Sequence, residues 1–104
     1  MIQSFKDTAT RDLFIKRRHR LWSNVQEVAC RKLDQIHAAI NLNDLKSPPG
    51  NQLEPLHGNR KGQHSIRVNG QCRICFVWKP DGAHDVEIVD YHDERKGRKR
   101  RGPQ

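Results

Sequence analysis

The sequence feature that most constrains the fold is a pair of alternating segments, residues 64–69 and 71–78, which meet at an Asn-Gly step. In both segments the even-numbered positions are the more apolar. Because successive side chains of a strand point to opposite faces of a sheet, each segment predicts a strand with one buried face. Asn-Gly favours a tight turn between two such strands. We therefore expect an antiparallel β-hairpin.

The register of this hairpin follows from matching the apolar faces. A two-residue turn would place Ile66 opposite Arg73, an apolar side chain against a charged one. A three-residue loop, residues 68–70 with its last residue left-handed, instead places Ile66 opposite Cys72. We predict the three-residue loop. It puts Arg67 and Arg73 together on the polar face, away from the helices.

Helical patterns precede the hairpin. A short helix to about Arg18 is predicted from an N-cap at Asp7 or Thr8. A second helix is predicted from Ser23 as N-cap with Gln26 completing a capping box. Its apolar stripe has helical spacing. The stripe consists of Val25, Ala29, Leu33, Ile36 and Ile40, and the helix is expected to end at Asn41 or Asn43.

The last predicted strand, residues 83–91, carries apolar residues on both faces, which is typical of a central strand. Residues 1–5 alternate weakly, as a short strand would. The order is therefore β, α, α and then an antiparallel meander, which predicts one α+β domain over residues 1–92 with the helices on one face of the sheet.

The charge balance points towards polyanions. The net charge of the chain is +8. In residues 93–104 six Lys and Arg outnumber two Asp and Glu, so half of this charge belongs to the tail. We expect the tail to be disordered, because it has almost no apolar surface to bury. A basic body favours nucleic acid as a partner. The basic run 16–20 is either a nucleic-acid contact or a solvated helix end.

Other classes are disfavoured. No stretch approaches the roughly 18 apolar residues of a membrane span, and the first residues lack a signal peptide's apolar region, so we expect a cytoplasmic protein without membrane contact. Three cysteines argue against a disulfide framework. Cys72 and Cys75, three apart in a strand, would face opposite ways and could not share a metal. We therefore expect neither a metal site nor a cofactor.

The loop before the hairpin combines a candidate proton carrier with cations. His57, Arg60 and Lys61 lie in a Gly-punctuated stretch, and Arg67 and Arg73 follow in the strands. RNA can be cleaved without a metal because the ribose 2′-OH is itself the nucleophile. The protein must accept its proton and stabilise charge on the phosphate. Histidine suits the first task and fixed arginines the second.

The combined motifs resemble those of the HigB toxins, a branch of the RelE/ParE superfamily of bacterial toxin–antitoxin systems that includes plasmid maintenance killer proteins. The resemblance rests on Pro-Pro-Gly-Asn at 48–51, Leu-x-x-Leu-x-Gly-Asn-Arg-x-Gly at 53–62, Ser-Ile-Arg-Val-Asn-x-x-x-Arg-Ile-x-Phe at 65–76 and Asp-Val-Glu-Ile-Val-Asp-Tyr-His at 85–92. It implies a RelE-like fold and a ribosome-dependent messenger RNA endonuclease acting at the 30S A site. It also implies a hetero-oligomer with a HigA-like antitoxin that carries a helix-turn-helix domain.

Carried over by position, the resemblance assigns the active surface to the basic loop, the strand arginine and the terminal Tyr-His pair. We interpret His92 and His57 as base and acid in an undecided order, Arg73 as the phosphate clamp and Tyr91 as a stacking or hydrogen-bonding group. The residues expected to hold the RNA backbone are Arg60, Lys61 and Arg67.

Two alternatives stay open at this point. On the same fold, ParE-like proteins inhibit DNA gyrase by binding and perform no hydrolysis. The histidines and the terminal Tyr-His pair favour the nuclease, because a gyrase poison needs no proton carrier. The other alternative is a small nucleic-acid-binding protein without toxicity, which would bind RNA or duplex DNA in a salt-dependent way.

Overall fold

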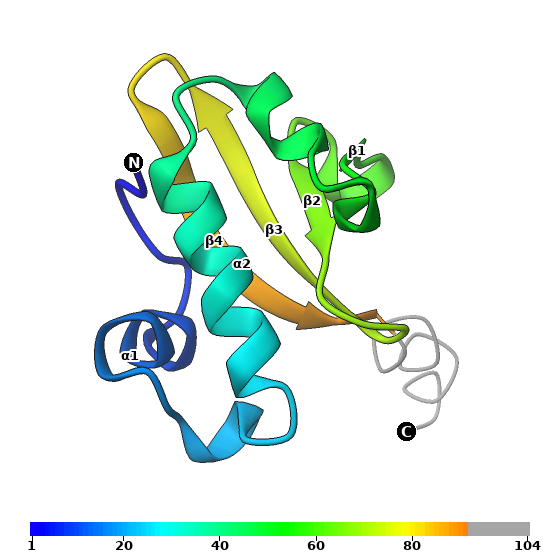
Figure 1. The fold of residues 1–104 in the computed structure, drawn as a ribbon. Helices are drawn as coiled ribbons and strands as arrows, with labels where there is room; N and C mark the ends of the chain where they lie inside the picture. Colours follow the sequence, from blue (N-terminus) through cyan, green and yellow to red (C-terminus); the bar gives the residue numbers. More distant parts are fainter. Residues whose placement is uncertain (92–104) are drawn as a thin grey trace.

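A four-stranded antiparallel sheet, with strand order β1-β2-β3-β4, forms one layer of the protein, and two α-helices cover one of its faces (Figure 1). The computed structural model describes residues 1–91, so His92 and the tail 93–104 lie outside the described residues. The elements in chain order are α1 (Thr8–Lys16), η1 (Arg20–Trp22), α2 (Gln26–Ala38), η2 (Leu42–Lys46), η3 (Pro49–Asn51), β1 (Glu54–Pro55), η4 (Gly58–Arg60), β2 (His64–Arg67), β3 (Cys72–Lys79) and β4 (Gly82–Asp90). The predicted α+β fold with helices on one face is confirmed.

The N-terminal segment lies along the outer edge of β4. Ile2 and Phe5 form parallel bridges to Ala83 and Val86, so β4 has neighbours on both sides, as its two apolar faces predict. The approach is close at Gly82, where φ is +130° and an added Cβ would lie 2.0 Å from the carbonyl oxygen of the first residue. Only glycine fits there.

The start of α1 agrees with its sequence pattern, and the start of α2 does not. The Asp7 carboxylate accepts a hydrogen bond from Thr10 N at 2.7 Å and caps α1. The predicted capping box at Ser23 is wrong: Ser23 ends η1, and α2 begins after Val25, which makes no side-chain cap bond. The extra 3₁₀ turn after α1 takes up the residues expected to cap α2.

The end of α2 also differs from the prediction. The helix ends at Ala38, and Ile40 is 86% exposed instead of continuing the apolar stripe. The backbone N–H groups of Ile40 and Asn41 donate to the Asp44 carboxylate. These bonds belong to a capping box that starts η2, so the chain turns away from α2 earlier than the apolar spacing indicates.

The main core lies between the helices and the even-numbered face of the hairpin. Its fully buried members include Leu13, Leu33, Ile36, Ile66, Ile74, Phe76 and Val86. Cys72 belongs to this core, whereas Cys75 belongs to a smaller cluster on the other side of the sheet. The prediction that these two cysteines face opposite ways is confirmed.

The hairpin register is shifted by two residues from the predicted one. Ile66 pairs with Ile74 and not with Cys72, and Arg67 pairs directly with Arg73. The side chain of Asn69 accepts hydrogen bonds from the backbone N–H groups of Gln71 and Cys72, at 2.8 Å each. These bonds place the loop at residues 69–71. A shift of two preserves the faces, so the shared face of Arg67 and Arg73 is confirmed.

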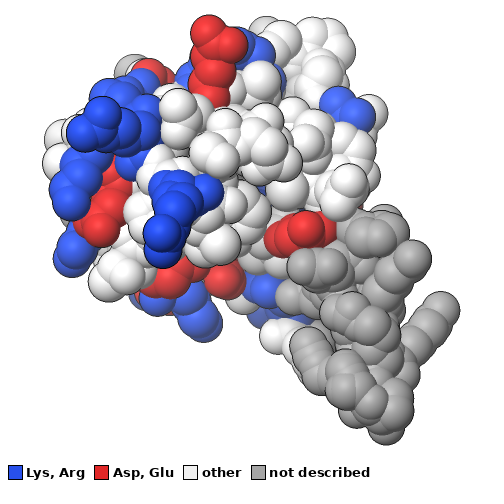
Figure 2. All heavy atoms as spheres, turned by 90° about the horizontal axis from the view of Figure 1, so that it is seen from below, with Lys and Arg blue, Asp and Glu red and all other residues white. Residues whose placement is uncertain are grey.

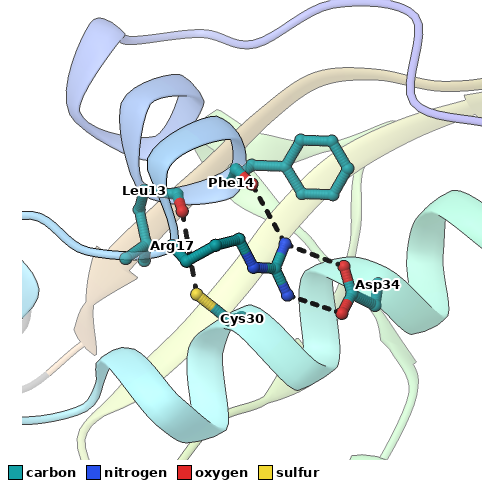
Figure 3. Close-up of polar contacts among 5 residues, drawn as sticks. All are labelled: Leu13, Phe14, Arg17, Cys30 and Asp34. Atoms are coloured by element: carbon teal, nitrogen blue, oxygen red, sulfur yellow. Dashed lines mark hydrogen bonds and ion pairs between the residues drawn. The ribbon is translucent and has the colours of Figure 1, made fainter.

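Arg17 connects the two helices (Figure 3). It ends α1 in the left-handed conformation with φ 67°, and its guanidinium makes a bidentate contact with Asp34 of α2 at 3.1 and 2.6 Å. It also donates to the carbonyl oxygen of Phe14 at 3.0 Å. Beside it, the buried Cys30 Sγ donates to the Leu13 carbonyl oxygen at 3.7 Å. This member of the basic run is therefore held in a helix-to-helix contact.

No helix within the described residues has the length and apolar character needed to cross a bilayer.

Candidate functional site

The face of the sheet opposite the helices carries a small apolar cluster surrounded by polar side chains. Leu56, Cys75 and Val89 are buried there, and Tyr91 packs against them. Side chains alternate along a strand, so the odd-numbered residues of β2 and β3 share this face, together with Glu87 and Val89 of β4 beyond the register shift near Cys75. We call it the helix-free face. It contains four of the predicted site residues.

Arg73 is held in place from two directions on the helix-free face. Its Nε atom donates to Ser65 Oγ at 2.6 Å, and its Nη2 atom donates to the carbonyl oxygen of Gln52 and, at 3.3 Å, to that of Ser65. Glu54 Oε1 lies 4.0 Å from Nε. The Arg73 side chain is 11% exposed, and Nη1 makes no hydrogen bond to any residue in the range 1–91. A guanidinium that is fixed in this way is suited to receive a phosphate oxygen.

Arg60 reaches the same face from the loop before β2. Its Nη1 atom contacts Glu87 Oε2 at 3.0 Å and Gln63 Oε1 at 3.2 Å. The side chains of Arg60 and Glu87 are 21% and 15% exposed, so the pair is largely withdrawn from solvent. Half-buried ion pairs of this kind are screened less than exposed ones. The positive charge of Arg60 is thus already partly balanced by a carboxylate.

Tyr91 lies between the apolar cluster and the arginines. Its hydroxyl is 3.7 Å from Cys75 Sγ, and its backbone N–H donates to the Gln71 carbonyl oxygen at 2.7 Å. Burial and the neighbouring Cys75 raise the pKa of Tyr91 to about 12, against the opposing effects of Arg60 and Ser65. At neutral pH the phenol keeps its proton. It can donate a hydrogen bond but cannot act as a base.

The loop that carries His57 and Lys61 projects beside this face. Its base is closed by a hydrogen bond from Leu56 N to the Gln63 carbonyl oxygen at 2.9 Å, and both His57 and Lys61 are exposed. His57 directly follows Leu56, which packs in the apolar cluster. The structure therefore places His57 and Lys61 at the rim of the helix-free face, with Arg60 turned inwards between them.

Arg67 lies on the same face, directly opposite Arg73 in the pairing of β2 with β3. Its Nη2 atom lies 4.0 Å from the position that a Cβ would take at Gly70, so its guanidinium extends towards the hairpin turn. Like-charged residues directly opposite one another in a sheet repel, and this repulsion is reduced when an anion binds between them. His92, the remaining candidate, lies outside the described residues.

Several residues that position the arginines are absent from the sequence-based set. They are Gln52, Glu54, Gln63, Ser65 and Glu87. The alternation of the strands contains a signal for two of them, since Ser65 is in phase with Arg67, and Glu87 is in phase with Tyr91. Gln52 and Gln63 belong to irregular segments, and Glu54 belongs to the two-residue strand β1, which is too short for alternation to be informative.

Another basic region lies on the side of the molecule that carries α1. Seen from below, Lys and Arg side chains gather there (Figure 2), and the exposed residues of the run 16–20 include Lys16, Arg18 and Arg20. Within residues 1–91 no three His, Cys, Asp or Glu side chains are arranged to hold a metal ion.

Comparisons with known proteins show to which family the chain is related. The family model described as the RelE-like toxin of the type II toxin–antitoxin system HigB matches residues 3–93. Toxin HigB-1 of Vibrio cholerae is 46% identical over 77 residues, which cover 73% of this chain and 80% of the relative. Endoribonuclease HigB of Proteus vulgaris is 30% identical over 98 residues, which cover 88% of this chain and all of the relative.

Among solved structures, the YoeB–YefM complex from Staphylococcus aureus contains a chain with a similar fold. The TM-score is 0.55 at 17% sequence identity, with 84% of this chain and 93% of that chain covered. At this identity the likeness concerns the fold. Together with the family model and the two relatives, it leads to one conclusion: the chain belongs to the HigB family of RelE-like toxins of type II toxin–antitoxin systems.

Proposed function

We propose that this toxin is a ribosome-dependent messenger RNA endoribonuclease that inhibits translation without a metal ion. The observation that carries the proposal is Arg73, a nearly buried arginine whose Nε and Nη2 atoms are fixed by Ser65 and Gln52, while Nη1 makes no hydrogen bond within residues 1–91. A relative that aligns over its whole length is named an endoribonuclease, which supports the same chemistry.

In the proposed reaction the 2′-OH of a nucleotide attacks the adjacent 3′ phosphate. A base takes the 2′ proton, the new bond gives a 2′,3′-cyclic phosphate, and an acid returns a proton to the departing 5′ oxygen. His92 and His57 serve as base and acid, in an order left open here. Arg73 stabilises the negative charge that develops on the phosphate.

The other site residues bind and orient the RNA. The neutral phenol of Tyr91, with its pKa of about 12, donates a hydrogen bond to a phosphate or ribose oxygen or stacks on a base. Lys61 and Arg67 neutralise flanking phosphates from the rim. Arg60 contributes through its Glu87-bound guanidinium, which is oriented before RNA arrives. A preformed site of this kind lowers the reorganisation needed during the reaction.

The proposed partners follow from the family. A HigA-like helix-turn-helix antitoxin would silence the toxin in a hetero-oligomer, and the related fold in Staphylococcus aureus comes from a complex, YoeB–YefM. The proposed site of action is the A site of the 30S subunit in the cytoplasm. The basic tail, 93–104, would add non-specific affinity for ribosomal RNA. A chain ending at His92 that binds ribosomes as tightly as the full chain at physiological salt would contradict that role.

The proposal is tested by growth arrest on induced expression. Arg73→Ala and His92→Ala should each abolish the arrest, because they remove the charge stabilisation and a proton carrier. Arg31→Ala is the matched control, since Arg31 is exposed on α2, on the opposite side of the sheet. Arrest that persists in the His92 variant, together with inhibition of DNA gyrase by the purified protein, would replace the nuclease with a binding toxin.

A further inference from the structure

The Pro-Pro-Gly-Asn segment, 48–51, has no role in the site described so far. Its last residue, Asn51, is fully buried although its side chain is polar. A buried amide is costly unless its donors and acceptor are all satisfied. Its partners therefore indicate what holds this segment in place.

The Asn51 side chain is bonded at both ends. Its Nδ2 atom donates to the carbonyl oxygens of Leu45 and Ser47 at 3.2 and 3.3 Å and to Gln35 Oε1 at 3.0 Å. Its Oδ1 atom accepts a hydrogen bond from Lys32 Nζ. Lys32 is itself only 7% exposed, and burial lowers the pKa of its ammonium. The amide thus joins α2 to the η2–η3 segment through hydrogen bonds that an apolar side chain could not make.

The residue after Asn51, Gln52, is one of the two residues to which the Arg73 side chain donates hydrogen bonds. Gln52 is left-handed, with φ 46° and ψ 55°, and its N–H donates to the Pro49 carbonyl oxygen at 3.1 Å. Its own carbonyl oxygen accepts from Arg73 Nη2. A residue other than glycine keeps a left-handed conformation only where its surroundings fix it. Here the fixed neighbour is the buried amide of Asn51.

We propose that Asn51 and Lys32 are positioning residues, which hold the Gln52 carbonyl and so set the direction of the Arg73 guanidinium. The proposal rests on the proposed function, in which Arg73 clamps the phosphate. Asparagine is specified because aspartate would turn a carboxylate towards three acceptors. An apolar residue would leave Lys32 buried without its acceptor. Contacts on the helix side of the sheet thereby determine geometry on the helix-free face.

The test compares Asn51→Ala with Asn41→Ala. Asn41 caps η2 in the same segment, and its side chain has no bond to Asn51, Gln52 or Arg73. For Asn51→Ala we expect kcat for RNA cleavage on ribosomes to fall about 10- to 100-fold with KM nearly unchanged. The Arg73 Nε–H signal in nuclear magnetic resonance, assigned through its loss in Arg73→Lys, should exchange with solvent about tenfold faster. Asn41→Ala should change neither.

A folded Asn51→Ala protein with unchanged kcat and an unchanged Arg73 signal would overturn the proposal, as would equal effects in Asn41→Ala. If Asn51→Ala does not fold, Lys32→Met provides a second comparison, because it keeps a long unbranched side chain and removes the ammonium group that donates to Oδ1. The magnetic resonance measurement needs no RNA. It tests the positioning by itself, so absence of cleavage in the unmodified protein would contradict the proposed function without affecting this result.

Discussion

Arg73 Nε lies 2.6 Å from Ser65 Oγ, and this bond crosses from β3 to β2 on the helix-free face. Ser65 is fully buried, so its hydroxyl offers the guanidinium an acceptor that water does not replace. The orientation of Arg73 is thereby fixed before any RNA binds.

Because the bond involves a charged donor, we expect it to contribute about 1.5–3 kcal/mol to the free energy of unfolding. A double-mutant cycle of Ser65→Ala with Arg73→Ala should give a coupling energy in that range from denaturant unfolding. The same cycle with Arg31→Ala in place of the Arg73 change should give no coupling, since Arg31 is exposed on α2. A coupling near zero for the first cycle would show that the bond does not form in solution.

Glu87 limits the positive charge available to RNA. It faces Arg60 at 3.0 Å, with both side chains largely buried. Glu87→Gln preserves an acceptor and removes the negative charge, so Arg60 should bind a phosphate more strongly. We expect tighter binding of single-stranded RNA and a steeper dependence of log K on log salt, by up to about 0.7 for one added phosphate contact.

Glu27→Gln is the matched control for this measurement, because it changes the net charge equally from an exposed position on α2. If the two variants bind RNA equally well, the gain comes from net charge alone, and Arg60 has no special part in binding.

The ionisation of Tyr91 can be measured directly because it is the chain's one tyrosine. Its pKa is raised to about 12, mainly by burial, so the folded protein should develop phenolate absorbance with a midpoint near pH 12. In denaturant the midpoint should return to about 10. The folded pKa exceeds the unfolded one, so the contribution of Tyr91 to stability is fully present below about pH 10. It is lost as the pH rises towards 12.

Leu56→Ala removes a side chain that packs beside the ring, and it should lower the Tyr91 midpoint. A midpoint near pH 10 in the unmodified folded protein would mean that the ring is solvated. Tyr91 would then not pack between the apolar cluster and the arginines.

Arg17 provides a test of the helix-to-helix contact in Figure 3. Arg17→Gly and Arg17→Ala both remove the contact with Asp34, but only alanine must keep a side chain at φ 67°. We expect the glycine variant to be more stable than the alanine variant by about 1 kcal/mol, or about 4 °C in Tm. At Lys16, within α1, the order of the two substitutions should be reversed. The same order of stability for the glycine and alanine variants at both positions would contradict the left-handed conformation at the end of α1.

The parts of the fold that could be predicted are those with a strict period. Alternation identified β3 and β4 and the shared face of Arg67 and Arg73, and it survived a register error because a shift of two leaves the faces unchanged. The helical stripe identified α2 through Ile36. It failed at Ile40, where a side-chain carboxylate of Asp44 competes for backbone N–H groups that would otherwise continue the helix.

The candidate site was less predictable because its support comes from outside the strands. Alternation can place Arg73 on a face, but it cannot show that the carbonyl of Gln52, in a left-handed turn, receives the guanidinium. The partner of Arg60 is Glu87, 27 residues later in the chain. Contacts of this range depend on tertiary packing, for which a single sequence has no periodic signal.

The most direct test of the central claim is to map the 5′ ends of messenger RNA after a brief pulse of expression, with the unmodified chain beside Arg73→Ala and Arg31→Ala. We predict new ends phased to codons within translated regions, absent for Arg73→Ala and retained for Arg31→Ala. Growth arrest with intact transcripts would contradict it, as would cleavage that continues unchanged without Arg73.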